Sequence, residues 1–222
     1  MTGFNNSISF DIERYLLTEG YEIIAGIDEA GRGALAGPLV VGLVIYNKSI
    51  IQNPPKEILS YIHDSKQLSP KNRVKALEHI RKYSITYNTA VISHQIIDTV
   101  NINRATEYAV KQLIRKTSPV PGIIIMDGNF KFDVGIPFTP IIKGDSKSIT
   151  IASGSIAAKV KRDALMEKYD LIYPGYHFKK NKGYGTAKHL EAIREKGPCQ
   201  IHRKSYEPVK GLINNSKSAN ED

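Results

Sequence analysis

The sequence predicts an α/β domain with a helical extension at its C-terminal end. Up to residue 173, short runs of β-branched and aliphatic residues alternate with longer segments whose apolar residues recur at helical spacing. Pro174-Gly175 interrupts this alternation, and only helical patterns follow. We therefore expect a core over residues 1–173, a helical extension over 174–213, and a disordered polar tail over 214–222.

Five strands are expected, and each follows from the residue types in its segment. Two runs rich in Ile, Val and Leu are typical of buried strands, a third segment alternates apolar with polar residues, and two shorter apolar runs follow. In chain order, the predicted strands are residues 21–27, 38–46, 84–92, 122–126 and 136–142.

Helices are expected where apolar residues recur every three or four positions. Ser69-Pro70 gives the clearest start, because a serine hydroxyl accepts from the free N–H groups of a first turn and proline fits that turn. The predicted helices are residues 8–20, 69–83, 101–117, 147–169 and 186–196, with a further helix after Gly197-Pro198.

The chain is basic and shows no signal for export or membrane insertion. Its 31 Lys and Arg against 22 Asp and Glu give a formal net charge of +9, which favours nucleic acid over a partnerless basic surface. The one cysteine, Cys199, excludes an intrachain disulfide. Because no apolar run reaches the roughly 18 residues of a membrane span and no leader is apparent, we expect a cytoplasmic protein without a membrane partner.

Acidic residues follow two of the predicted strands. Asp28-Glu29 ends the first strand, and Asp127 ends the apolar run Ile123–Met126. If the two strands are parallel neighbours, Asp28 and Asp127 converge at the carboxyl edge of the sheet, where α/β domains bind ligands. The alternative is that each acid simply begins a turn.

A third acid, Asp163, continues the apolar stripe of the helix predicted over 147–169. A carboxylate on that face is desolvated unless it is paired or bound to a metal. The alternatives are an ion pair with Lys159, four residues earlier, or a boundary position in water.

Clustered carboxylates repel one another, and a divalent cation relieves that repulsion. Oxygen ligands without His or Cys suit Mg²⁺ or Mn²⁺ rather than zinc. Such ions activate water and stabilise a displaced phosphate. Acids, basic charge and the absence of a nucleophile motif together indicate phosphodiester hydrolysis.

A small-residue segment, Ala30–Gly37, directly follows the first acid pair. Glycines let the backbone approach a ligand closely, and turn N–H groups can face a phosphate or a sugar. Arg32, between Gly31 and Gly33, adds a charged donor. A plain turn between strands is the alternative.

These residues resemble the motifs of the ribonuclease HII family, in the family's order, over about residues 21–209. The most specific matches are Gly26–Gly33 with Leu35–Pro38, and Lys143–Ser148 with Ala157–Asp163. The remaining matches are Asp64–Ser69, Asp127–Asn129, Lys182–Thr186, His189 and His202–Pro208.

The resemblance implies a ribonuclease H-like fold, a mixed five-stranded sheet flanked by helices, with a substrate-binding C-terminal extension. It implies cleavage of the RNA strand of RNA–DNA hybrids and cutting 5′ of single ribonucleotides in duplex DNA, leaving 3′-hydroxyl and 5′-phosphate ends. The implied catalytic and metal-binding residues, which hold two Mg²⁺ or Mn²⁺ ions, are Asp28, Glu29, Asp127 and Asp163.

The resemblance also implies substrate-binding residues. Gly31, Arg32 and Gly33 would read the 2′-hydroxyl at an RNA–DNA junction, and Tyr184 would stack on the following deoxyribose. Tyr184 could instead be an ordinary half-exposed aromatic. Three lysines are expected to contact substrate phosphates or to shift the pKa values of the acids: Lys66, Lys147 and Lys159. The alternative is that they are ordinary solvated side chains.

Three positions depart from the family pattern. Asn181 replaces a usual histidine, Tyr206 replaces a usual phenylalanine, and Gly154 replaces a usual alanine. The glycine is expected to weaken its helix by up to about 1 kcal/mol. None of the three touches the four acids, so the reaction itself is not in question.

Two other functions compete with the nuclease. A non-catalytic nucleic-acid-binding module on the same fold predicts that one of the acids is lost, and all are present. A metal-dependent phosphatase predicts an Asp two residues after a nucleophilic Asp, and Ala30 stands there after Asp28. A monomer is expected, and a DNA-sliding clamp is a conceivable partner of the tail.

Overall fold

The computed structural model describes residues 8–62 and 68–218, with side chains up to residue 213, so Lys66 lies outside the described residues. The chain forms two compact units. The first comprises Met1–Ala30, Val40–Ala90 and Glu107–Val160, and the second comprises Gly31–Leu39, Val91–Thr106 and Lys161–Asp222. Two long helices, α5 (His94–Lys116) and α6 (Ile149–Ile172), therefore contribute residues to both units.

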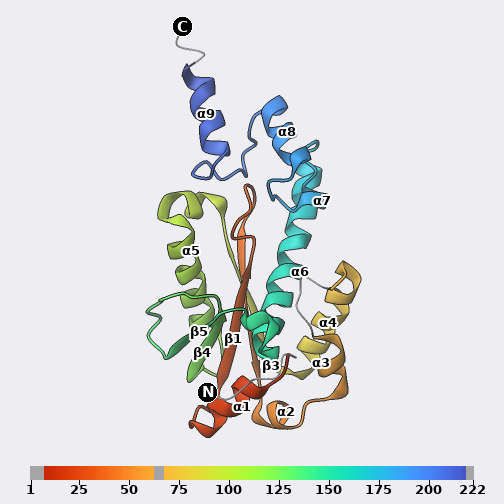
Figure 1. Cartoon of the computed structure of the whole chain (residues 1–222), viewed down its shortest axis with the longest axis vertical. Helices are drawn as coiled ribbons and strands as arrows, with labels where there is room; N and C mark the ends of the chain where they lie inside the picture. The colour runs from red at the N-terminus through yellow and green to blue at the C-terminus, as the bar shows by residue number, and fades with distance from the viewer. Residues whose placement is uncertain (1–7, 63–67, 219–222) are drawn as a thin grey trace. The chain divides into compact units, whose positions relative to one another are not determined.

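The first unit contains a mixed five-stranded sheet, as predicted (Figure 1). The strands are β1 (Ile24–Ala30), β2 (Leu39–Tyr46), β3 (Ser84–Ile92), β4 (Ile123–Asp127) and β5 (Phe138–Ile141), in the order β3-β2-β1-β4-β5. The central strand β1 is antiparallel to β2 and parallel to β4, which is in turn parallel to β5. The parallel pair β1–β4 brings the carboxyl ends of two acid-bearing strands to the same edge of the sheet.

Helices flank the sheet (Figure 1), and α4 (Pro70–Tyr83) begins as the sequence predicts. The Ser69 hydroxyl accepts from the Asn72 N–H at 3.2 Å, and Pro70 occupies the first turn. Two helices, α2 (Lys48–Gln52) and α3 (Lys56–Tyr61), were not predicted, because one or two turns are too short to display a helical period. The predicted helix 101–117 is the second part of α5, which Asn101 interrupts with a φ of 69°.

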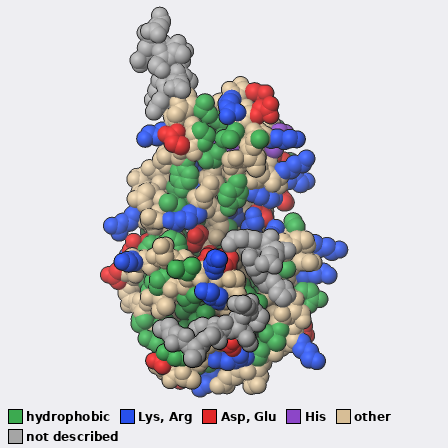
Figure 2. Space-filling view, viewed as in Figure 1, with side chains coloured by type: hydrophobic (Ala, Val, Ile, Leu, Met, Phe, Trp, Pro, Cys, Tyr) green, Lys and Arg blue, Asp and Glu red, His purple; other side chains and the backbone are tan. Residues whose placement is uncertain are grey.

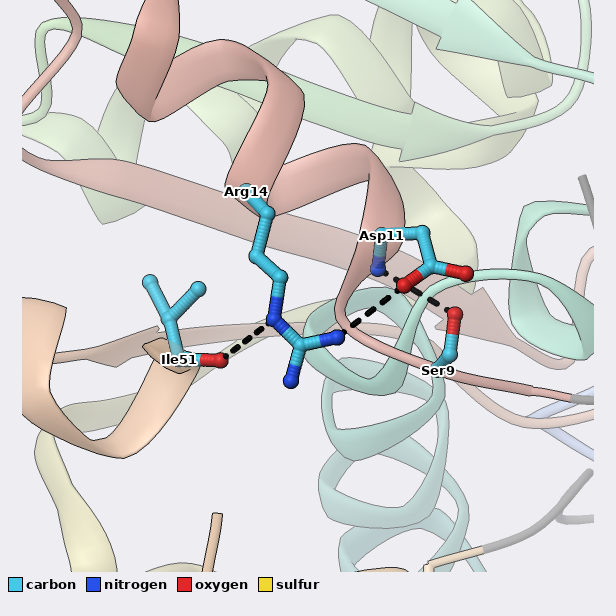
Figure 3. Close-up of polar contacts among 4 residues, drawn as sticks. All are labelled: Ser9, Asp11, Arg14 and Ile51. Carbon is cyan, nitrogen blue, oxygen red and sulfur yellow. Dashed lines mark hydrogen bonds and ion pairs between the residues drawn. The ribbon is translucent and has the colours of Figure 1, made fainter. Parts of the chain in front are cut away.

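Figure 3 shows how α1 (Asp11–Thr18) is attached within this unit. The Ser9 hydroxyl accepts from the Asp11 N–H at 3.1 Å. Arg14 donates to the Asp11 carboxylate at 3.0 Å and to the Ile51 carbonyl of α2 at 3.1 Å. These contacts fix the first turn of α1 and hold the helix against α2.

Glycines allow α6 to lie directly on the sheet. A Cβ at Gly26 of β1 would fall 2.3 Å from the Thr150 carbonyl carbon, and one at Gly42 of β2 would fall 2.2 Å from the Gly154 carbonyl oxygen. A Cβ at Gly154 would lie only 3.0 Å from the Gly42 oxygen. The predicted loss of helix propensity at Gly154 therefore accompanies an unusually close helix–sheet contact.

The second unit is built from the Gly31–Leu39 segment, the later part of α6 and three further helices: α7 (Phe178–Asn181), α8 (Ala187–Lys196) and α9 (Val209–Ser218). Its core includes Leu35, Met166 and Phe178. The helix expected directly after Gly197-Pro198 begins only at Val209, and α9 extends into the range predicted as a disordered tail. Among the helices that the structure describes, none combines the length and the apolar character that a membrane span requires.

Candidate functional site

Three aspartates of the first unit meet at the carboxyl edge of the sheet. The parallel register pairs Ile27 with Met126, so Asp28 and Asp127 occupy the next position of β1 and β4. A ligand oxygen from each of Asp28, Asp127 and Asp145 lies within 4.8 Å of the other two. The convergence predicted for Asp28 and Asp127 is thus confirmed, although 99 positions separate them.

Asp145 was not assigned a role from the sequence. It lies buried on a short 3-10 helix, η1 (Gly144–Ser146), which follows β5 and precedes α6. The Gly144 N–H donates to Asp127 Oδ1 at 2.7 Å, which ties η1 to the end of β4. A sequence signal was present, because Asp145 also follows a predicted strand and lies within one of the most specific family motifs.

The Asp28 carboxyl occupies a strongly unfavourable place for a negative charge. It is only 4% exposed, and its pKa is raised first by burial and then by the neighbouring Glu29 and Asp127 carboxylates. A hydrogen bond from Ser155 and one from the Glu29 N–H, at 2.7 Å, oppose this shift only in part. An ion of opposite charge would relieve the repulsion, so the oxygen-only donor set fits Mg²⁺ or Mn²⁺.

Two of the predicted acids are not among these three residues. Glu29 follows Asp28 on β1, and its charge raises the pKa of the Asp28 carboxyl. Asp163 lies on the part of α6 that belongs to the second unit. Among the described residues, the three-carboxylate group therefore contains Asp145 and is built from the first unit alone.

Two of the predicted lysines belong to the first unit as well. Lys147 is exposed and directly follows η1, two residues after Asp145. Lys159 is half-buried on α6. The position of Lys147 beside an acid-bearing turn suits a contact with a substrate phosphate.

The glycine segment of the second unit is held by side chains from several elements. The Arg32 guanidinium donates to Thr106 Oγ1 at 3.1 Å and to Asn103 Oδ1, both on α5. Arg32 therefore anchors the segment through its side chain, rather than extending a free donor as the sequence suggested. Gly31 has a φ of 91°, and a Cβ there would overlap the Arg162 guanidinium at 1.9 Å.

Tyr184 is 38% exposed, and its ring packs against the Arg162 guanidinium, whose central carbon lies 5.4 Å from the ring centroid. Asn181 shapes the turn before it. The Asn181 carboxamide donates to the Tyr176 carbonyl at 2.7 Å and accepts from the Gly183 N–H at 2.8 Å. Asn181 thus supplies two hydrogen bonds next to Tyr184.

His189 of α8 is buried. Its Nδ1 lies 2.8 Å from the Tyr184 carbonyl oxygen, and its Nε2 lies 3.1 Å from Nε2 of the buried His202. His202 Nδ1 accepts from the Cys199 N–H at 2.9 Å. This pair supports the Tyr184 turn from inside the second unit.

On the face drawn in Figure 2, basic side chains are scattered and do not form a single patch. Figure 2 shows Lys and Arg over the whole drawn face, with Asp and Glu between them. A formal charge of +9, with basic side chains spread over this face (Figure 2), suits a polyanionic ligand more than a small one.

Comparisons with known proteins agree with these observations. The model of the family described as Ribonuclease HII matches residues 25–209. The ribonuclease HII of Caldicellulosiruptor saccharolyticus is 47% identical over 197 residues, 89% of this chain and 93% of that protein. The crystal structure of ribonuclease H2 from Pyrococcus horikoshii OT3 has a TM-score of 0.74 at 23% identity, over 88% of this chain and 99% of that chain.

A further solved structure, Bst ribonuclease HIII in complex with Mn²⁺, has a TM-score of 0.65 at 19% identity. It covers 88% of this chain and 70% of that chain. These two structures share the fold, whereas the family assignment rests on the family match and on the 47% identical relative. The chain therefore belongs to the ribonuclease HII family.

Proposed function

We propose that this endoribonuclease, which hydrolyses the RNA strand of RNA–DNA hybrids, also cuts 5′ of single ribonucleotides in duplex DNA. The products would carry 3′-hydroxyl and 5′-phosphate ends. The observation that carries the proposal is the group of three aspartate carboxylates at the ends of β1 and β4 and on η1. Roles in removing embedded ribonucleotides and RNA primers follow from this specificity.

The metal-binding residues we propose are Asp28, Glu29 and Asp127, completed by Asp145 on the geometry of the first unit. Asp163, which the sequence motif suggests, is the competing candidate for the fourth acid. Two bound Mg²⁺ or Mn²⁺ ions would supply an activated water and neutralise charge on the phosphate being displaced. The chain's own contribution is to hold the carboxylates rigidly, since the Gly144 N–H fixes Asp127 and the Glu29 N–H fixes Asp28.

The substrate-binding residues we propose are Gly31, Arg32, Gly33 and Tyr184 in the second unit, with Lys147, Lys159 and Lys66 as phosphate contacts. Tyr184 offers an exposed ring face whose position is fixed by Arg162. The glycine segment offers a backbone that a ligand can approach closely, because nothing lies within 4 Å of a Cβ placed at Gly33.

A non-catalytic nucleic-acid-binding module on the same fold is the second candidate. The clustering of Asp28, Asp127 and Asp145 speaks against it. A module that only bound nucleic acid would gain nothing from three buried or half-buried carboxylates that repel a phosphate backbone. We further propose that the protein acts in the cytoplasm as a monomer and that a DNA-sliding clamp is its partner.

A cleavage assay tests the proposal. Labelled duplexes with one embedded ribonucleotide, an RNA–DNA hybrid, or DNA only are incubated with Mg²⁺ or Mn²⁺ and with Asp127→Asn as the inactive control. We expect a nick 5′ of the ribonucleotide, no cutting of the all-DNA duplex, and a rate loss above about 100-fold in the variant. Binding without any cutting would favour the non-catalytic module.

A matched pair of variants identifies the fourth acid. Asp145→Asn and Asp163→Asn make the same neutral, nearly isosteric change. We expect Asp145→Asn to lose activity like Asp127→Asn and to require more Mg²⁺ for half-maximal rate, whereas Asp163→Asn keeps most of the activity. The reverse result would return Asp163 to the metal site and leave Asp145 as a structural residue.

A further inference from the structure

We infer that Arg203 and Tyr206 are positioning residues for ribonucleotide recognition, because they orient the backbone N–H groups of Arg32 and Gly33. The inference rests on the proposed reading role of the Gly31–Gly33 segment. It assigns that role to the backbone and not to the Arg32 side chain, and it names the two side chains that set the backbone direction. All the contacts involved lie within the second unit.

The Arg203 guanidinium binds backbone carbonyl groups of the Gly31–Gly33 segment. Its side chain is fully buried. One terminal nitrogen donates to the Gly31 carbonyl at 2.7 Å, and the other donates to the Arg32 carbonyl at 2.7 Å. The guanidinium also reaches the Gly37 carbonyl, at 3.1 and 3.2 Å, so it spans the whole turn.

The hydrogen bonds from Arg203 to these two carbonyls determine the direction of the Arg32 and Gly33 N–H groups. In a planar trans peptide, the N–H lies opposite the carbonyl of the same peptide unit. The Gly31 carbonyl shares its peptide with the Arg32 N–H, and the Arg32 carbonyl shares its peptide with the Gly33 N–H. Because both carbonyls face the buried Arg203, both N–H groups point away from it, and Gly33 is exposed.

Consecutive amide donors of this kind suit an oxygen acceptor, such as a hydroxyl or a phosphate oxygen. The Arg32 guanidinium is engaged by Asn103 and Thr106, which leaves recognition to the backbone. A 2′-hydroxyl is the group that separates a ribonucleotide from a deoxyribonucleotide. The direction of these amides therefore bears on discrimination between the two.

Tyr206 donates a further hydrogen bond to the peptide between Arg32 and Gly33. Its hydroxyl donates to the Arg32 carbonyl at 3.0 Å, and its ring lies 5.0 Å from the Arg203 guanidinium carbon. A phenylalanine at this position would lack that hydroxyl. This chain therefore fixes the Arg32 carbonyl with two donors where a phenylalanine would leave only the arginine.

The segment that carries Arg203 is itself fixed. The Arg203 N–H donates to the Leu35 carbonyl at 2.8 Å. The Asp98 carboxylate accepts from the Lys204 N–H at 2.9 Å, from the Ser205 N–H at 3.0 Å, and from the Ser205 hydroxyl at 2.5 Å. Arg203 is therefore held rigidly enough to impose a direction on the peptides that it binds.

The test measures discrimination in the catalytically inactive Asp127→Asn background. Binding is measured for a duplex with one ribonucleotide and for the same duplex made of DNA only, both with Mg²⁺ present. Tyr206→Phe is the principal variant because it removes one hydroxyl. Tyr173→Phe is the matched control, because it removes a hydroxyl that donates to Gln200, at 3.0 Å, outside the segment.

We expect Tyr206→Phe to reduce the preference for the ribonucleotide duplex by about 3- to 10-fold, the usual effect of one lost hydrogen bond. Tyr173→Phe should leave the preference unchanged. In the active enzyme, Tyr206→Phe should raise KM for the ribonucleotide substrate more than it lowers kcat, a division that a general loss of folding would not produce.

Arg203→Lys gives a second, stronger perturbation, since lysine keeps the charge but loses the planar set of donors. Circular dichroism and thermal unfolding would verify that this variant folds, and we expect a larger loss of preference than in Tyr206→Phe. If Tyr206→Phe and a folded Arg203→Lys both keep the parent's preference for the ribonucleotide duplex, the inference is overturned while the proposed reading role of the Gly31–Gly33 segment stands. No preference in the Asp127→Asn parent would overturn both the proposed reading role and the inference.

Discussion

At the scale of the residue, one arrangement of protons accounts for the hydrogen bonds of the buried histidine pair, although the Cys199 carbonyl oxygen also lies 3.2 Å from His202 Nδ1. The Cys199 N–H requires a lone pair on His202 Nδ1, which places the proton of His202 on Nε2. That proton is donated to His189 Nε2, and His189 Nδ1–H is then left to donate to the Tyr184 carbonyl. Both rings are neutral in this arrangement.

The pair predicts a pH-dependent stability. Burial, followed by the neighbouring His189, lowers the pKa of His202 to about 4. The imidazole of the unfolded chain binds a proton near pH 6.5. The stabilisation of the folded state by the neutral His202 ring is therefore complete above pH 6.5, and it is lost as the pH falls from there towards about 4. The loss amounts to about 3 kcal/mol at most, at 1.36 kcal/mol per pKa unit.

Urea unfolding at several pH values, compared with His202→Asn, measures this contribution. The asparagine variant should be less stable at pH 7.5, and the difference from the parent should shrink as the pH falls to 4.5. A difference that stays constant with pH would mean that the ring is not held neutral. The comparison with the parent cancels the effects of other buried groups on the free energy of unfolding. Glu13 is one of them, and its raised pKa makes its contribution change with pH in the opposite direction.

At the scale of the element, the contact of α6 with β1 and β2 places Ser155 of α6 against the Asp28 carboxyl. The start of the same helix is held by the buried Glu13 carboxylate of α1, which accepts from the Ser148 hydroxyl at 2.6 Å and from the Thr150 N–H at 3.0 Å. Close packing along the helix and a buried hydrogen-bonded acid at its beginning therefore both support the acid-bearing edge of the sheet.

This packing predicts that Gly42→Ala is strongly destabilising. The new methyl group would lie 2.2 Å from the Gly154 carbonyl oxygen and 2.9 Å from the Ala158 nitrogen, and both are backbone atoms of a packed helix. Overpacking of this kind costs about 1–3 kcal/mol. Gly122→Ala is the matched control, because its Cβ would meet its nearest neighbour only at 3.7 Å. Equal unfolding midpoints for the two variants would contradict the expected contact.

The elements also explain what the sequence could and could not predict. Strands β1 and β4 and the cap of α4 were predictable because apolar runs, turns and capping residues are local signals. The site was predictable only in part. Asp28 and Asp127 end apolar strands, but Asp145 lies in a short turn whose place beside them depends on the β4–β5 pairing and on the hydrogen bond from Gly144.

At the scale of the whole molecule, the net charge predicts how substrate binding depends on salt. A protein that neutralises duplex phosphates releases counterions, and each phosphate contributes about −0.9 to the slope of log affinity against log salt concentration. With a formal charge of +9, we expect KM for a duplex to rise steeply between 50 and 200 mM KCl, by on the order of 10-fold or more. The value of kcat should change little, because the carboxylates and their hydrogen bonds are buried or half-buried and so are weakly screened.

A pair of lysine variants locates part of that charge. Lys147 directly follows the acid-bearing η1, at the edge of the sheet where β1 ends. Lys48 begins α2, just after β2, and the pairing of Ile45 with Ala25 places the end of β2 where β1 begins. Both lysines are exposed.

Lys147→Ala should lower the salt slope of log KM by about 0.9, the value for one phosphate contact, whereas Lys48→Ala should leave the slope unchanged. Equal slopes in the two variants would mean that Lys147 contributes only through the overall charge, because a general electrostatic field would respond alike to either loss.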